Sequence, residues 1–490
     1  MRAFPARISV TTSSDSMLFS CLAARWRQPL ATWHLTGALL LLAMAGQAQP
    51  APAPSAVAQP ISLTQALELA RRNAPHLQAK AYQVQAAEAD ITQARTQRLP
   101  SVRLSGQVSY GSTNAVAGTI LPIGTVIPSN GTLAGVNSYN AVFGSMGTAL
   151  AEWSPVTFGQ YPAQLARAEA ARGYAQADAD NEWFTQQLRV AQTYLDLLAT
   201  QSLRRVREQD VRRVGTLEKT ITRLALNGLR PGVDSTLARA AEAQARLALI
   251  AAREQEADRQ ARLSTLLGQP GRRWQPDTVY NARLPLALAL PPATHPTLGL
   301  QQRAVELGQA RETSIRRSYR PRLSLLGATW GRGSGIGYNG QTDYGLGGAA
   351  PTRFNYALGV GLVFDVLDWP RLRAQARAEN LRTQGLQAEY RQQQLELSNQ
   401  ATLAEQRLAL AADRARQAPV QLAASRQAYR QKLALYDAGL ATVVDVTQAL
   451  YALQQAEQDQ VLTANAAWQA VLLQTAAAGD FSFFFTHLTP

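Results

Sequence analysis

The chain has 490 residues, of which 48 are lysine or arginine, 34 are aspartate or glutamate and one is cysteine. Its formal net charge of +14 could indicate a nucleic-acid-binding protein. The arginines, however, are spread among Glu, Gln and Ala, with no basic cluster and no interleaved aromatic residues. This pattern predicts solvated helix faces and argues against a nucleic-acid partner.

The chain begins with the features of an export signal. Residues 36–48 form a short apolar run that ends in small residues, and Arg25 and Arg27 precede it. A basic flank, a short apolar core and a small-residue exit are typical of a secretory signal, and the run is too short to span a bilayer. We therefore predict a signal peptide at 1–48, with Met17 as an alternative start. A retained membrane anchor is the other interpretation of this run.

Removal of the signal would also remove Cys21, the only cysteine. The exported chain is therefore expected to have no disulfide and no thiol chemistry. Residues 49–60, which come next, are rich in Pro and Ala and are predicted to form an extended tether.

The rest of the sequence repeats itself at long spacing. Pro75 and its neighbours match Pro296 and its neighbours, and the segment at Gly228 matches the segment at Gly439. A repeat of this period predicts two equivalent structural units. The predicted organisation is a first repeat at 61–268, a linker at 269–296, a second repeat at 297–479 and a C-terminal tail at 480–490.

Each repeat reads as a helix, two strands and a helical hairpin. In the first, Ile61 to Gln97 is helical in composition with a break at Pro75. Val102 to Tyr110 then alternates between apolar and polar residues, which predicts a strand, and a weaker strand is predicted near 141–156. A long stretch without helix breakers follows at about 160–226, and a shorter one at about 233–267.

The second repeat shows the strands more clearly. One strand opens at Leu323, residues 331–350 are a Gly-rich loop, and Phe354 to Val366 has an apolar residue at every second position. Helical composition then extends over about 371–435 and 443–478. At about 1.5 Å per residue, the longest of these helices are on the order of 100 Å long.

Strands of this length have a specific use in an exported protein. About 9–11 tilted residues cross a bilayer, and every backbone group in lipid needs a partner, so the sheet must close. Four strands are too few to close, since membrane barrels begin at about eight. Several chains must therefore share one barrel, and three chains would give about twelve strands. The helices are too polar for lipid and must lie in water.

This order of elements, present twice, resembles the TolC-like outer membrane factors. The segment from Tyr436 through Gly439 to Asp445 is similar to the hairpin turn of that family, and the strand entries at Leu99-Pro100 and Arg320-Pro321 also fit. The resemblance implies a mixed α and β fold with internal duplication. Four transmembrane strands per chain would join a homotrimeric, twelve-stranded barrel in outer membrane lipid, and α-helical hairpins would form a periplasmic tunnel.

The resemblance also implies a function. Such a protein is a passive exit duct of a tripartite efflux or type I secretion system, located in the outer membrane with its helices in the periplasm. It docks by its hairpin tips to a periplasmic adaptor and, through the adaptor, to an inner-membrane transporter. The expected adaptor-contacting residues are Gly228, Leu229, Gly439 and Leu440.

In the same family the tips close the tunnel, and this implies a periplasmic gate. Asp445 occupies the place of a lumen-facing aspartate, whereas Gln448 stands where a second aspartate is expected, so the negative ring should be single. Tyr436 and Asp234 match residues that hold the tips shut. An arginine expected two residues after Gly439 is replaced by alanine, and Arg230 occupies the corresponding place in the other hairpin.

Other interpretations stay open at this point. Asp234 and Asp445 lie just before new helices, where aspartate is a favoured N-cap, and Tyr436 could simply pack between helices. An exported coiled-coil structural protein or adhesin is the alternative function. That interpretation leaves the four alternating strands and the two matched turns unexplained.

The sequence offers no support for an enzyme. His76, His295 and His487 lie far apart without metal-ligand spacing, and there is no nucleophile–base arrangement and no cofactor fingerprint. We therefore expect no catalytic activity, no cofactor and no metal.

Overall fold

The structure is a computed structural model that describes residues 59–112, 139–282, 285, 295–337 and 341–486. The predicted signal peptide, most of the tether, part of the linker and the last residues of the tail lie outside the described residues.

Helices dominate the described part of the chain, and they follow the predicted order twice. In the first repeat the helices are α1 (Leu63–Asn73), α2 (Pro75–Thr96), α3 (Gln160–Leu226) and α4 (Gly232–Leu266). The linker adds α5 (Val279–Ala282). The second repeat and the tail contain α6 (Pro296–Ser318), a 3-10 turn at Val366–Asp368, α7 (Trp369–Asp437), α8 (Val443–Ala478) and α9 (Ser482–Thr486). No helix in this part of the chain combines the length and apolar character that a membrane crossing needs.

Two strands were predicted in each repeat, and these pair into one sheet. The strands are β2 (Ser101–Gly111), β3 (Val142–Val156), β5 (Arg322–Ser334) and β6 (Arg353–Val363). They lie in the order β2-β3-β5-β6, and every neighbouring pair is antiparallel. Two short strands, β1 (Gln59–Ile61) and β4 (Trp274–Pro276), form a separate parallel pair.

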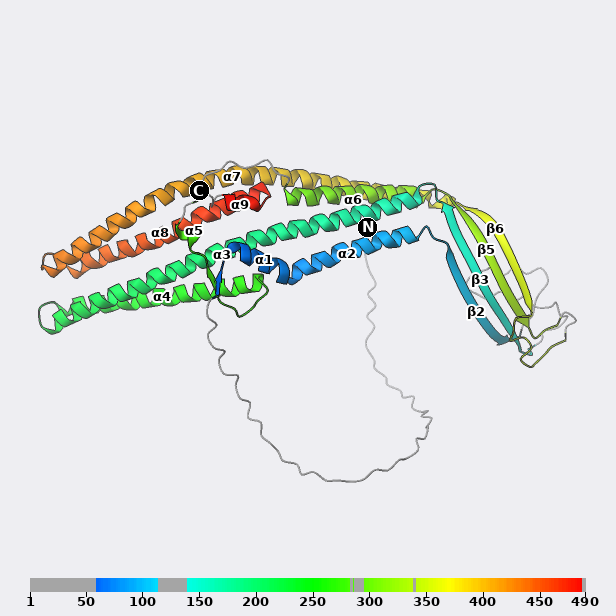
Figure 1. Ribbon diagram of the computed structural model, residues 1–490, viewed down its shortest axis with the longest axis horizontal. Helices are drawn as coiled ribbons and strands as arrows, with labels where there is room; N and C mark the ends of the chain where they lie inside the picture. The colour runs from blue at the N-terminus through cyan, green and yellow to red at the C-terminus, as the bar shows by residue number, and fades with distance from the viewer. Residues whose placement is uncertain (1–58, 113–138, 283–284, 286–294, 338–340, 487–490) are drawn as a thin grey trace, which may run out of the picture. The chain divides into compact units, whose positions relative to one another are not determined.

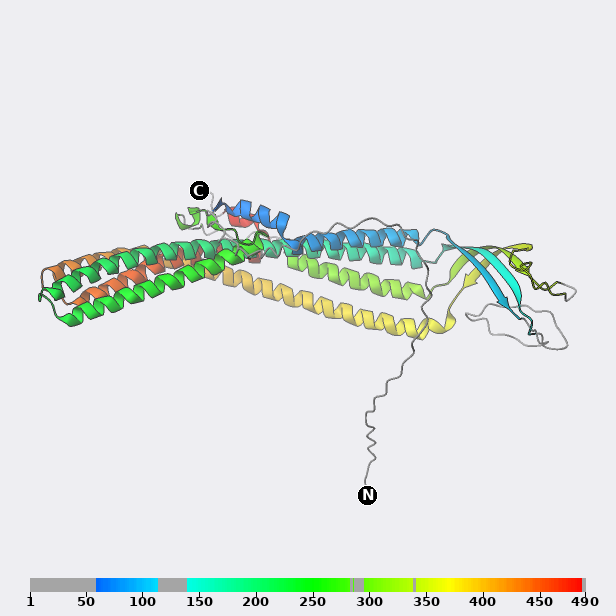
Figure 2. The same cartoon turned by 90° about the horizontal axis from the view of Figure 1, so that it is seen from below.

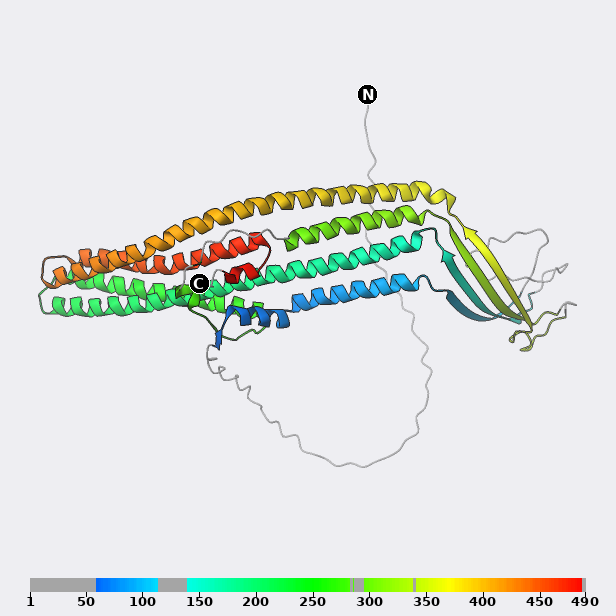
Figure 3. The same cartoon turned by 45° about the horizontal axis from the view of Figure 1, so that its top comes forward.

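The helices reach the sheet in the same order as the strands. α2 runs into β2, β3 returns into α3, α6 runs into β5, and β6 returns through the 3-10 turn into α7. Figures 1 and 3 show these four helices side by side, with the strands beyond one of their ends. At the other end of α3 and α7 the chain reverses into α4 and α8, so two helical hairpins turn at the same end (Figure 2).

The sheet has two unlike faces because the register places apolar residues opposite one another. Leu104 lies opposite Ala149, which lies opposite Thr329, which in turn lies opposite Tyr356. Directly opposed residues share a face. The apolar alternation of β2 and β6 therefore falls on a single face. The other face contains the polar residues of β2, such as Ser105 and Gln107.

An aromatic core holds the two repeats together near the middle of the helices. Tyr194 of α3, Tyr280 of α5 and Trp468 of α8 are buried and meet edge to face, with ring centroids 5.9 Å and 5.1 Å apart. Phe484 of the tail packs 5.8 Å from Trp468 and is fully buried. The C-terminal tail thus docks against the helices through its buried phenylalanines.

A second, ionic contact joins the hairpins between this core and the tips. Asp210 of α3 is 1% exposed, and its carboxylate lies 3.7 Å from a guanidinium nitrogen of Arg207 and 3.7 Å from one of Arg213. Arg213 also donates to both carboxylate oxygens of Glu457 on α8, at 3.2 and 3.0 Å. Arg426 of α7 lies 3.7 Å from Glu457. No hydrogen bond reaches either oxygen of Asp210 within the described residues.

Burial of Asp210 predicts a pH-dependent stability. Burial raises the pKa of this carboxyl from its ordinary 3.8 to about 6, because it outweighs the attraction of Arg213 and Arg207. A raised carboxyl pKa means that the folded state loses stability as the pH rises from about 4 to about 6 and gains none above that range. Asp210→Asn should therefore raise the stability at pH 8 by on the order of 2 kcal/mol, with a much smaller gain at pH 4.

Thermal unfolding of the detergent-solubilised protein at the two pH values measures this difference. Asp413→Asn, at an exposed ion pair on α7, is the matched control and should change neither value much. A melting temperature that stays equal or falls at pH 8 for Asp210→Asn would contradict the prediction.

Candidate functional site

The two hairpin turns are the first part of the site, and each is a left-handed glycine turn. In the first, Gly228 has φ +70°, its N–H donates to Ala225 O at 3.0 Å, and Leu229 N–H donates to Leu224 O at 2.9 Å. This pair of bonds is the Schellman motif that closes a helix C-terminus. Because the glycine has positive φ, a residue with a Cβ would be strained there.

The second turn repeats the first. Gly439 has φ +79°, its N–H donates to Tyr436 O at 3.0 Å, and Leu440 N–H donates to Leu435 O at 2.8 Å. The sequence match between the two segments is therefore also a match of backbone geometry.

Both turns expose apolar side chains. Leu229 is 68% exposed and Leu440 is 77% exposed, and each directly follows its turn glycine. Val233 and Val444, the second residues of α4 and α8, are also exposed, at 62% and 50%. The four residues form two equivalent apolar pairs, one on each tip.

The two tips contact each other within one chain through Arg230 and Tyr436. The Arg230 guanidinium lies 4.4 Å from the centroid of the Tyr436 ring, and its Nη2 donates to Tyr436 O at 2.8 Å. Tyr436 is 1% exposed, and burial raises its hydroxyl pKa, while the charge of Arg230 opposes that rise. Its hydroxyl has no hydrogen-bond partner in the described part of the chain.

Tyr436 and Arg230 were predicted separately as gate residues, and the structure brings them into contact. Tyr436 also packs between helices, as the alternative interpretation held. It contacts Arg230 by its ring face and its backbone carbonyl, and these two contacts join the first hairpin to the second.

Asp445 has a local structural role at the start of α8. Its carboxylate accepts hydrogen bonds from Thr442 N–H at 3.0 Å and Thr442 Oγ1 at 2.7 Å, and Thr442 Oγ1 accepts from Asp445 N–H at 3.3 Å. Thr442 is thus the N-cap, and Asp445 completes a capping box from inside the first turn. The Thr442 backbone N–H is the main cause of the lowered pKa of Asp445.

Lys432 of α7 also contacts Asp445, with its Nζ 3.4 Å from Oδ1. This residue was missed by sequence reasoning, because a lysine on an exposed helix face carries no signal of its own. A cation beside Asp445 partly neutralises the charge on which a negative ring would depend.

Asp234 and Gln448 make fewer contacts. Asp234 lies in the first turn of α4, where its N–H donates to Pro231 O at 3.1 Å, so it is not the N-cap residue itself. Its charge contributes to the raised pKa of Tyr436. Gln448 is exposed on α8, one turn beyond Asp445. No group of three or more His, Cys, Asp or Glu side chains that could hold a metal ion occurs among the described residues.

A sheet with one apolar face, continued by long polar helices that turn twice at exposed tips, defines the class of outer-membrane export channels. Within this class, the chain belongs to the outer membrane efflux protein family, whose sequence model matches residues 66–269 and 293–479. Members of this family are passive channels of the outer membrane and not enzymes. No curated relative matches the sequence.

Solved structures show the same fold. The chain is similar to CusC, with a TM-score of 0.70, 16% identity, and 85% of this chain and 92% of that chain covered. It is also similar to VceC from Vibrio cholerae, with a TM-score of 0.67, 15% identity, and 85% and 96% covered. CmeC from Campylobacter jejuni gives a TM-score of 0.68 at 14% identity, with 85% of each chain covered.

Proposed function

We propose that this protein is the outer-membrane exit duct of a tripartite efflux or type I secretion system, with its helices in the periplasm. The observation that carries the proposal is the pairing of a one-sided apolar sheet with two matched, apolar hairpin tips at the far ends of the same helices. The alternative, an exported coiled-coil structural protein or adhesin, explains neither the apolar face of the sheet nor the two apolar tips.

The sheet supports a shared barrel of three chains. β2 and β6 each pair with only one strand and are the two edges of the sheet within the described chain. Edge strands leave a row of backbone groups unpaired, which lipid does not tolerate. Pairing of β6 with β2 of a second copy satisfies both edges, and three copies of four strands give a barrel of twelve.

The tips support docking to a periplasmic adaptor. The turn glycines Gly228 and Gly439 precede the exposed Leu229 and Leu440, and apolar side chains exposed at a fixed turn are suited to a hydrophobic pocket on a partner. An inner-membrane transporter would be reached through that adaptor.

A double variant, Leu229→Asp with Leu440→Asp, tests the docking. We expect export of the cargo to be lost, with the trimer and its membrane insertion unchanged, because both side chains are exposed and contribute little to folding. Export is measured in a strain that expresses the variant with its adaptor and transporter, and trimers are measured in membrane extracts. Leu247→Asp, at an exposed site along α4, is the control. Full export by the double variant would rule out tip docking.

Asp445 is proposed to form a single negative ring at the tunnel entrance, weakened by Lys432. Asp445→Asn keeps a hydrogen-bond acceptor for Thr442 and removes the charge, so cation selectivity in planar bilayers should fall. Lys432→Gln should raise it, because the carboxylate loses its neutralising partner. Asp258→Asn, on the exposed part of α4, should change nothing. Shifts of the same sign in the Asp445 and Lys432 variants would contradict the ring.

A further inference from the structure

A cavity on the side of the helices is rich in arginine and shares no residue with the hairpin tips. It has a volume of about 720 Å³ and opens between α3, α4 and the segment 271–278 of the linker. Arg205 of α3 lies 23 residues before Gly228, so the cavity is roughly 35 Å from the tips along the helix. It is therefore separate from the tip surface.

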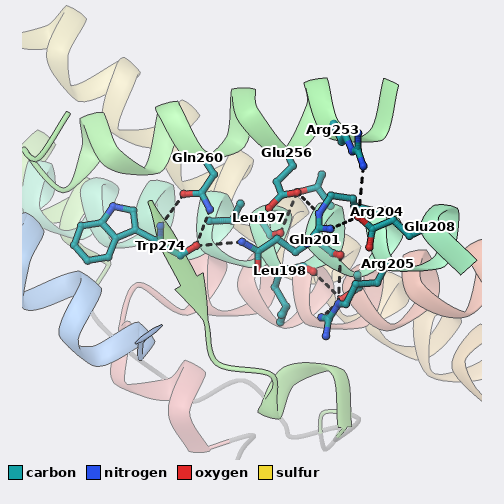
Figure 4. Close-up of polar contacts among 12 residues, drawn as sticks. Leu197, Leu198, Gln201, Arg204, Arg205, Glu208, Arg253, Glu256, Gln260 and Trp274 are labelled. Atoms are coloured by element: carbon teal, nitrogen blue, oxygen red, sulfur yellow. Dashed lines mark hydrogen bonds and ion pairs between the residues drawn. The ribbon is translucent and has the colours of Figure 1, made fainter. Parts of the chain in front are cut away.

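Part of the charge in this cavity is compensated. Arg204 of α3 donates to Glu256 Oε2 at 2.6 Å and to Glu208 Oε1 at 2.5 Å, as Figure 4 shows. Arg253 of α4 lies 3.9 Å from Glu208, which Arg204 already holds closely. These two carboxylates are therefore occupied by arginines of the same cavity.

The remaining arginines have no acidic partner within the described residues. Arg205 donates to Gln201 O and to Ser202 Oγ, which are neutral acceptors. Arg272 donates to Gln269 Oε1 at 2.5 Å and stacks 5.7 Å from the Trp274 ring centroid. The Arg273 guanidinium has neither a hydrogen bond nor an ion pair in this part of the chain. Three uncompensated positive charges therefore face one cavity.

The wall of the cavity is fixed before any ligand arrives. The Gln260 side chain accepts a hydrogen bond from the backbone N–H of Trp274 at 2.9 Å and donates one to the Trp274 carbonyl at 2.6 Å. Gln201 donates to the same carbonyl at 3.1 Å (Figure 4). Ser264 Oγ donates to Arg272 O at 2.6 Å, and β4 pairs with β1. A fixed frame of this kind lowers the entropic cost of binding.

We propose that this cavity binds an acidic peptide segment of a partner protein, whose carboxylates are held by Arg205, Arg272 and Arg273. Guanidinium groups bind carboxylates through paired, charge-assisted hydrogen bonds. Arg205 lies on α3, and Arg272 and Arg273 lie on the linker segment, so a ligand must present several carboxylates to reach all three together. A volume of about 720 Å³ accommodates several residues of peptide, and a single inorganic anion would fill only a small part of it.

Binding of a fluorescein-labelled hexaglutamate peptide to the purified full-length protein in detergent tests the proposal. Fluorescence anisotropy should show saturable binding that weakens as salt is added. The triple variant Arg205→Gln, Arg272→Gln and Arg273→Gln should bind at least tenfold more weakly. A control triple, Arg377→Gln, Arg391→Gln and Arg430→Gln, removes the same charge from exposed positions of α7 and should bind as the parent does.

Three outcomes would overturn the proposal. These are an equal loss of affinity in the two triple variants, displacement of the peptide by equimolar inorganic phosphate, and equal binding of a hexalysine peptide. The tip variant Leu229→Asp with Leu440→Asp should keep full affinity for hexaglutamate. The result for hexaglutamate binding is therefore independent of whether the tips dock to an adaptor.

Discussion

Leu358→Arg is expected to abolish the trimer that we propose for the outer membrane. Leu358 lies at the centre of β6, on the apolar face of the sheet, and its side chain is 85% exposed in the single chain. If this face meets lipid, the arginine stands near the middle of the bilayer, where it costs about 2–4 kcal/mol. The cost is incurred once in each copy, so a trimer would bear it three times.

The neighbouring residue provides a matched control. Ala357 is also exposed and in the middle of β6, but its side chain lies on the opposite face, because successive residues of a strand alternate. Ala357→Arg should therefore leave the trimer intact. Both variants are compared by electrophoresis of outer-membrane extracts with and without boiling. Loss of the trimer in both, or in neither, would contradict a lipid-facing assignment of the Leu358 face.

The strands show which strand boundaries the local sequence pattern predicts correctly and which it does not. Alternation predicted β6, but the strand ends at Val363, before the predicted end at Val366, because residues 366–368 turn into a 3-10 helix ahead of α7. β5 extends to Ser334, although residues 331–350 were expected to be loop. That part of the prediction was wrong because its glycines hide the alternation. Gly331 lies opposite Phe354, where a Cβ would come within 2.8 Å of the phenylalanine ring.

The beginning of the first repeat illustrates a different limit. Ile61 was predicted to open a helix, but it ends β1, which pairs in parallel with β4 in the linker. The helix α1 begins only at Leu63, after Ser62 as its N-cap. A three-residue strand depends on a partner more than 200 residues away, so no local pattern could reveal it.

In the candidate site, too, local features could be predicted from the sequence and long-range contacts could not. Both turns follow from a glycine after a long helix, and the sequence located them to the residue. The contact of Arg230 with Tyr436 joins residues 206 positions apart, and the contact of Lys432 with Asp445 joins two helices across a turn. Such pairs depend on how the hairpins pack, so only the structure could identify them.

Arg230→Ala is expected to loosen the two tips from each other and to raise the conductance of the channel. The substitution removes a guanidinium that stacks on a buried ring and donates to a carbonyl of the other hairpin. A desolvated cation–π contact and a charged hydrogen bond each contribute about 2 kcal/mol, and a net loss on the order of 2 kcal/mol shifts an equilibrium roughly thirtyfold. Single-channel recordings in planar bilayers measure the fraction of time in the larger conductance state.

Tyr436→Phe distinguishes this mechanism from a latch made by the tyrosine hydroxyl. The ring and the backbone carbonyl that Arg230 contacts both stay in that variant, and the hydroxyl has no hydrogen-bond partner in the described residues. The conductance should therefore equal that of the parent, whereas Tyr436→Ala should raise it as Arg230→Ala does. Arg223→Ala, at an exposed position near the end of α3, should have no effect. A rise in conductance for Tyr436→Phe would place the latch on the hydroxyl, and the guanidinium contact would then be a consequence of packing.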